Sequence, residues 1–185
     1  FMAGMNAPAS GGGNIGNVWM SGGTVDSGTG RIGIWGKSYA NSDLNTGVLL
    51  HTTNGSAETY IYSANRTAQA ITIYGDSGPS TNTSSDGIIA QGHGTLDNTW
   101  AYSSTHIIAS GLKDSADLTN KPGGGITITG IGTNSASSSW GNGIVWQWAD
   151  VIAKDGPITL TGTENTPSNS GAAGIYIGED NASMF

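Results

Sequence analysis

A pattern that recurs along the chain constrains its fold more than any other feature of the sequence. In each copy an apolar-x-apolar pair runs into a glycine, a polar loop follows, and a second glycine opens another apolar run. We name the first apolar stretch the A segment and the second the B segment. The copies read "RIGIWGKSYANSDLNTGVLLH" from Arg31, "ITIYGDSGPSTNTSSDGIIAQ" from Ile71, "ITITGIGTNSASSSWGNGIVWQ" from Ile126 and "ITLTGTENTPSNSGAAGIYIG" from Ile158.

A weaker third element, the C segment, precedes each copy. The C segments read "NVWMSGG" at Asn17, "TYIYSANR" at Thr59, "HIIASG" at His106 and "DVIAKDG" at Asp150. The chain therefore reads C, A, B in each repeat, and its variation in length falls in polar connectors. Insertions that go to loops while apolar strands keep their length are typical of a solenoid.

Each A and B segment offers only two inward side chains, because successive residues of a strand point to opposite faces. Such strands become stable when equivalent strands stack about 4.8 Å apart and their side chains form continuous apolar ladders. The predicted ladder residues are Ile32, Ile34, Ile71, Ile73, Ile126, Ile128, Ile158, Leu160, Val48, Leu50, Ile88, Ile144, Trp146, Ile175 and Ile177.

Three strand types per repeat predict an all-β fold, a three-sided parallel β-helix (β-solenoid) with about four coils and long polar loops. Parallel crossovers make the right-handed form the expected one. A β-sandwich is the main alternative, since it also consists of short strands between turns. A sandwich, however, does not require the same three-strand order in every repeat.

The composition agrees with one β-rich domain. The chain has 185 residues, 31 of them glycine, and only 10% of its residues are charged. No stretch shows a helical apolar period over three turns, so little or no α-helix is expected. We expect a single β-solenoid domain over 1–185, with a tail at 1–16, coils over 17–178 and a second tail at 179–185.

Charge and hydropathy exclude several functions. The net charge is −7, and the six Lys and Arg residues are dispersed, so the chain has no basic patch for nucleic acid. No apolar run approaches the roughly 20 residues of a membrane-spanning helix, so the chain is not expected to span a membrane. The absence of cysteine excludes disulfides and thiolate metal sites.

The segments "DVIAKDGPITLTGT", "GGGITITGIGT", "GNGIVW" and "GIYIG" carry a family resemblance. They resemble the repeats of filamentous-haemagglutinin-like bacterial surface adhesins and related giant β-strand-repeat surface proteins. The resemblance implies secretion, an extracellular position at the cell surface, and a role in adhesion or fibre formation. The coils are more irregular than the usual repeats of that family, and no N-terminal secretion-domain signature is seen.

We predict no catalytic, cofactor or metal site. Polysaccharide lyases and hydrolases with parallel β-helices place acidic and basic groups together on an exposed sheet. Here the outward residues of the B segments are apolar or aromatic: Leu49, Ile89, Val145 and Tyr176. The histidines, His51, His93 and His106, are too dispersed for a metal site.

Two groups of aromatic and apolar residues are candidates for contacts with partners. The first contains possible glycan or subunit contacts: Trp100, Tyr102, Trp140 and Trp148. The second lies in the tails and suits a joint between stacked copies: Phe1, Met2, Met5, Met184 and Phe185.

The function hypothesis is a non-enzymatic, extracellular structural protein. It is the repeat shaft, or a head-to-tail stacking subunit, of a bacterial surface fibre or adhesin, and its partners are copies of itself and a host or cell-surface glycan. The alternatives are a β-helical carbohydrate-active enzyme, a phage tail-spike fragment, and a carbohydrate-binding module that uses exposed aromatic residues.

Overall fold

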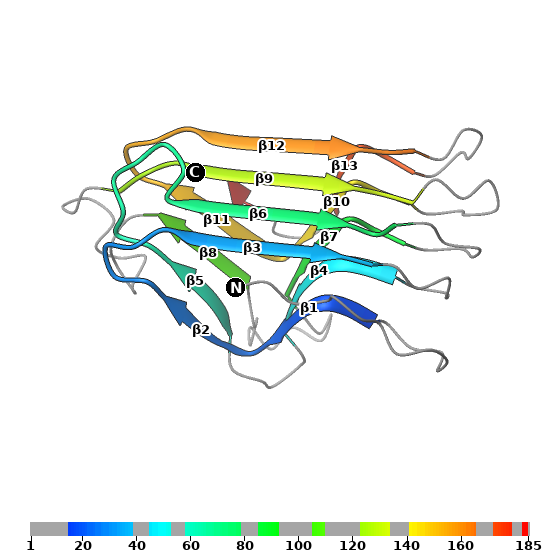
Figure 1. Ribbon diagram of the computed structural model, residues 1–185, viewed down its shortest axis with the longest axis horizontal. Coiled ribbons are helices and arrows are strands. Elements are labelled where there is room, and N and C mark those ends of the chain that lie inside the picture. Colours follow the sequence, from blue (N-terminus) through cyan, green and yellow to red (C-terminus); the bar gives the residue numbers. More distant parts are fainter. Residues whose placement is uncertain are drawn as a thin grey trace, which may run out of the picture.

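The computed structural model shows three parallel β-sheets arranged around a common interior (Figure 1). Apolar side chains fill this interior. It describes residues 15–38, 45–52, 58–78, 85–92, 105–109, 123–133, 141–165, 172–178 and 183–184. Within these ranges there is no helix, and every strand pair is parallel.

Each sheet collects one segment type of the repeat. The A sheet, ordered β12-β9-β6-β3, contains β3 (Ile32–Lys37), β6 (Ile71–Asp76), β9 (Ile126–Ile131) and β12 (Ile158–Thr163). The B sheet contains β1 (Ile15–Ser21), β4 (Asn45–His51), β7 (Ile88–Gln91), β10 (Ile144–Gln147) and β13 (Ile175–Ile177). The C sheet contains β2 (Gly23–Asp26), β5 (Thr59–Tyr62), β8 (Thr105–Ala109), β11 (Ala149–Ala153) and β14 (Ser183–Met184).

Neighbours within a sheet lie one repeat apart in the sequence, so the described strands form a β-solenoid. The chain passes through the three sheets in turn, and we call each passage a coil. Residues at equivalent positions of the repeat are register partners; Ile71, for example, pairs with Ile32 on one side and Ile126 on the other. The prediction of an all-β fold with stacked parallel strands is therefore confirmed.

The two glycines of each repeat meet at the base of the polar loop. A Cβ atom built on Gly130 would lie 2.0 Å from the carbonyl oxygen of Gly143, and one on Gly162 would lie 1.9 Å from that of Gly174. No side chain fits between backbones this close. The glycine pair is thus required where the A strand and the following B strand of one coil converge.

The interior is a continuous apolar ladder. Both inward residues of β6 and β9 are fully buried, as are Val48, Leu50 and Ile144. The largest buried side chain, Trp146, keeps its indole N–H satisfied by donating to the backbone oxygen of Ala149 at 2.7 Å. Complete burial of an aliphatic side chain contributes about 1.5–3 kcal/mol, so the ladder is the main source of stability.

The ladder opens at the last coil. Ile158 and Leu160 are half-buried, whereas Ile175 and Ile177 are 37% and 49% exposed. These strands have a sheet neighbour on one side only among the described residues, because β12 and β13 end their sheets. The prediction that Ile175 and Ile177 are core residues is therefore wrong for the isolated chain.

The first C segment was also misassigned. The stretch "NVWMSGG" at Asn17 lies mostly in β1, which pairs with β4 in the B sheet, and the first C strand is β2. The corner between these strands uses Gly22 (φ 66°) and Gly23 (φ 145°), conformations that favour glycine. The described strands therefore run from a B strand to a C strand, and the expected complete C-A-B coils are not what the chain forms.

Candidate functional site

The end of the solenoid formed by β1, β2 and β3 is a hollow that opens into the apolar interior. Its volume is about 380 Å³, and its walls include inward residues from all three sheets: Val18, Met20, Val25, Ile32 and Ile34. Trp19 at the rim is 61% exposed and Val25 is 37% exposed, whereas Val18, Ile32 and Ile34 are buried. We call this surface the first end.

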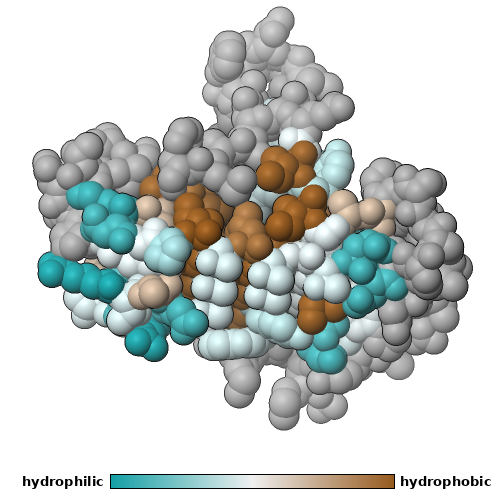
Figure 2. Space-filling model, turned by 90° about the horizontal axis from the view of Figure 1, so that it is seen from above, coloured by the Kyte–Doolittle hydropathy of each residue, from teal (hydrophilic) through white to brown (hydrophobic). Residues whose placement is uncertain are grey.

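The opposite end, formed by β12, β13 and β14, also presents core residues to solvent. Figure 2 looks onto this surface and shows apolar side chains gathered across its middle, beside a paler strip of weakly polar residues. The exposed Ile175 and Ile177 and the half-buried Ile158 and Leu160 belong to it. We call this surface the second end.

The two ends carry the same rows of the repeat. Register partners connect Val18 through Val48, Ile88 and Ile144 to Ile175. In the same way Met20 is connected to Ile177 through Leu50, Ala90 and Trp146. If β1 of another copy continued the B sheet beyond β13, its inward residues would therefore extend the same two rows.

A separate hollow lies on the outer face of the B sheet. Its volume is about 330 Å³, and we call it the B-sheet groove. It is lined by Asp86, Ile89, Gln91, Asn142, Val145, Gln147 and Tyr176. The outward row predicted to be apolar or aromatic forms its floor, and the sequence analysis did not identify the polar residues beside that row.

Asp86 is the most perturbed group of the groove. Its Oδ1 accepts hydrogen bonds from the backbone N–H of Asn142 at 2.8 Å and from Asn142 Nδ2 at 2.9 Å. The side chain belongs to a residue only 8% exposed, and this burial raises the pKa of Asp86 to about 6, against the lowering effect of the Asn142 hydrogen bonds. The hydrogen bonds from Asn142 hold the carboxyl group in place, but they offset only part of the cost of removing it from water.

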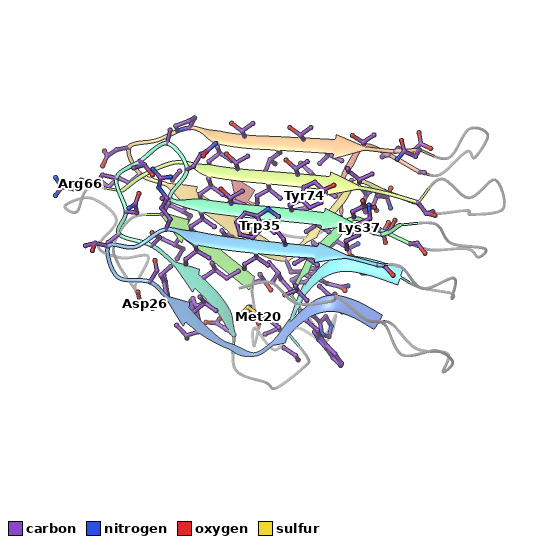
Figure 3. All side chains as sticks on the ribbon, in the orientation of Figure 1. Met20, Asp26, Trp35, Lys37, Arg66 and Tyr74 are labelled. Carbon is purple, nitrogen blue, oxygen red and sulfur yellow. The ribbon has the colours of Figure 1, made fainter. Side chains whose placement is uncertain are left out.

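A pair of aromatic residues, one exposed and one half-buried, lies on the outer face of the A sheet. Trp35 and Tyr74 are register partners on β3 and β6, where Figure 3 labels them (Figure 3). The Trp35 ring lies directly over Gly33, since a Cβ atom on Gly33 would come within 2.0 Å of the ring. Trp35 remains 45% exposed. The Gly-x-Trp spacing within an A segment is the signal that could have predicted this ring position.

Of the predicted contact residues, the structure describes the side chain of Trp148. It is half-buried at the corner between β10 and β11, in the left-handed region with φ 55°, and its backbone oxygen accepts from the Thr105 N–H at 3.3 Å. Met184 lies in β14 as the register partner of Val151. The remaining ones lie outside the described residues: Trp100, Tyr102, Trp140, Phe1, Met2, Met5 and Phe185.

Three further observations concern metal sites, membrane spans and similarity to known proteins. In the part of the chain that the structure describes, no group of three or more His, Cys, Asp or Glu side chains could hold a metal ion. No helix among those residues is long and apolar enough to cross a membrane. No protein-family model, curated protein or solved structure matches this chain.

Proposed function

We propose that this chain is a structural, non-enzymatic β-solenoid that forms part of the shaft of an extracellular fibre or adhesin on a bacterial surface. The observation that supports this is that the two ends carry the same inward rows of the repeat and that each exposes apolar side chains of those rows, Val25 at the first end and Ile175 and Ile177 at the second. In this proposal the solenoid is right-handed, has about four coils, and continues through further coils at both ends.

The further coils come from a second copy of the chain. At the joint, β13 of one copy pairs with β1 of the next, which places Ile175 beside Val18 and Ile177 beside Met20. In the C sheet, β14 pairs with β2 and places Met184 beside Val25. These pairs extend the existing rows and bury side chains that are exposed in the single copy, including Val25 and Ile177.

The A sheet needs one additional strand at this joint. Among the described strands the B and C sheets have five each, whereas the A sheet has four. Pairing in the B and C sheets therefore leaves one strand position open between β12 and the β3 of the next copy.

The joint also covers backbone groups. Among the described strands, those at each end have a sheet neighbour on one side only, and such edges favour pairing with another chain. The contact joins different surfaces of the two copies, so it does not close on itself and generates a filament. A glycan at the cell surface is the partner that the side faces of such a shaft would encounter.

The test is the state of assembly across a concentration series, measured by light scattering and electron microscopy. We expect particles that lengthen with concentration. The variant Ile177→Lys places a charge on the second end and should keep the chain monomeric. Its matched control, Thr161→Lys, changes an exposed outward residue of the same coil and should assemble like the unchanged chain.

Two results would contradict the proposal. One is a chain that stays monomeric at high concentration. The other is assembly that Ile177→Lys leaves intact, because that would place the contact between copies somewhere other than the second end. Hydrolysis or lyase activity on a glycan panel would favour the enzymatic alternative instead.

A further inference from the structure

The B-sheet groove lies on the side of the solenoid and crosses three successive coils, from β7 to β13. Its floor is one outward row, in which Val145 of β10 is the register partner of Ile89 on β7 and of Tyr176 on β13. Two strand spacings separate the first and last of these residues, so the floor is about 10 Å long. A ligand that fills it is extended and lies across the strands.

One wall of the groove is a ladder of side-chain amides. Gln91 Nε2 donates to Gln147 Oε1 at 3.1 Å, which fixes the two side chains one above the other. The next position in this row is Gly178, and a Cβ atom there would lie 2.5 Å from Cγ of Gln147. Glycine therefore leaves room for the Gln147 side chain. The ladder leaves Gln91 Oε1 as an acceptor and Gln147 Nε2 as a donor for a ligand.

The other wall holds the buried carboxyl group of Asp86. Its Oδ1 is occupied by the two Asn142 donors, and Asn142 Oδ1 in turn accepts from the Ala173 N–H at 2.8 Å. No donor in the described ranges reaches Asp86 Oδ2. A buried polar atom without a partner costs free energy, so this oxygen is suited to a hydroxyl group supplied from the groove.

We propose that the B-sheet groove binds a neutral oligosaccharide that lies across β7, β10 and β13. A sugar chain offers hydroxyl groups that donate to the carboxyl oxygen of Asp86 and accept from Gln147. Its C–H faces pack on the aliphatic floor and on the ring of Tyr176. The coil spacing repeats the polar positions along the groove, as a polymer of similar units requires.

Other ligand classes fit less well. A polyanion is disfavoured by the carboxyl group in the groove and by the net charge of −7. Extended peptides bind the edges of sheets through backbone hydrogen bonds, whereas this groove lies on a face. A purely apolar ligand would leave both polar walls without partners.

The test is calorimetric titration of the full chain with maltohexaose, cellohexaose and chitohexaose, and with hexagalacturonate as the anionic probe. We expect at least one neutral hexasaccharide to bind and hexagalacturonate to bind more weakly. Tyr176→Ala and Gln147→Ala should each weaken binding about tenfold, through lost packing on the ring and a lost hydrogen bond.

Tyr60→Ala is the matched control. Tyr60 is a half-buried tyrosine of the C sheet whose ring stacks on Tyr62 at 5.3 Å, and its removal should leave binding unchanged. Circular dichroism of each variant verifies the fold. Failure of every neutral probe to bind, preference for hexagalacturonate, or unchanged affinity in both groove variants would overturn the proposal. The proposal does not depend on stacking, because Ile177 does not line the groove. Ile177→Lys should therefore bind the same probe as the unchanged chain.

Discussion

Ile144 and Ile175 are the same amino acid in the same row, yet they lie in different surroundings. They are register partners on β10 and β13. Ile144 is fully buried, whereas Ile175 is 37% exposed, because β13 is the last strand of its sheet. The comparison shows that the burial of a residue in a row depends on whether another part of the molecule covers the end of that row, and not on the amino acid alone.

The middle coils are therefore a closed core, whereas the second end leaves the inward side chains of β13 partly exposed. At the first end Val25 is 37% exposed while its register partner Ile61 is fully buried, whereas Val18, Ile32 and Ile34 are buried there. A repeat of uniform sequence thus acquires two distinct regions with different stabilities. Four predictions follow this difference, ordered by the size of the expected effect.

The largest effect is expected from truncating the same residue type in the two regions. Ile144→Ala should lower the free energy of unfolding by about 2–5 kcal/mol, because it leaves a cavity in a closed core. Ile175→Ala should cost less than about 1 kcal/mol in dilute solution, where its side chain is partly in water. Denaturant unfolding monitored by circular dichroism measures both values.

The concentration dependence of the same pair sharpens the comparison. If copies stack through the second end, Ile175 becomes a core residue and the cost of Ile175→Ala rises with protein concentration. The cost of Ile144→Ala stays the same. Equal costs for the two variants in dilute solution would mean that the second end is covered within a single copy.

Much of the fold could be predicted because two of its determinants can be read from short stretches of sequence: the alternation of inward and outward side chains, and the spacing of the glycines. The alternation in "ITIT" fixes which side chains of β9 face inward, and the paired glycines mark where strands converge. The first C segment could not be assigned in this way, since "NVWMS" has the alternation of a B strand and lacks only the preceding glycine. Pairing with β4, a contact distant in sequence, decides its sheet.

The B-sheet groove was missed for a related reason. Asp86 and Asn142 occupy the position just before the second glycine of their copies, and Gln91 and Gln147 end their B strands. Each residue alone resembles a polar loop residue. Only alignment of the copies places them in rows, and only the structure shows that a hydrogen bond joins the members of each row.

The second prediction concerns Asp86, whose partner Asn142 lies one coil away in the closed region. Because its pKa is raised to about 6 from 3.8, the folded chain holds this proton more tightly than the unfolded chain does. The contribution of Asp86 to stability is therefore highest below about pH 4, falls as the pH rises to about 6, and is constant above that. The loss attributable to this group is about 3 kcal/mol.

Asp86→Asn should remove this dependence. The amide oxygen can still accept from Asn142 and carries no charge to bury, so the variant should be more stable than the unchanged chain at pH 8 and similar to it at pH 4. Thermal melts at both values check this. A variant that is less stable at pH 8 would show that the ionised carboxylate contributes to the fold.

The third prediction concerns the glycine contact at the base of the loops. Gly130→Ala should destabilise the fold by about 1–3 kcal/mol, because its Cβ atom would lie 2.0 Å from the backbone oxygen of Gly143. Gly30→Ala is the control in the terminal region, where the nearest atom, the Ser27 oxygen, lies 3.1 Å away. Comparable losses in urea unfolding would mean that the backbones can separate without cost.

The smallest effect is expected at the surface of the first coil. Lys37 Nζ lies 2.8 Å from Asp76 Oδ2, and the two residues are register partners on β3 and β6. The lysine side chain is 46% exposed, so water and salt screen the pair, and Lys37→Ala should cost no more than about 1 kcal/mol. Because the screening is ionic, the difference between the variant and the unchanged chain should shrink when the melts are repeated in 1 M salt. A cost that equals that of Ile144→Ala, or that is independent of salt, would mean that cross-coil polar pairs, rather than apolar ladders, hold neighbouring strands together in the terminal coil.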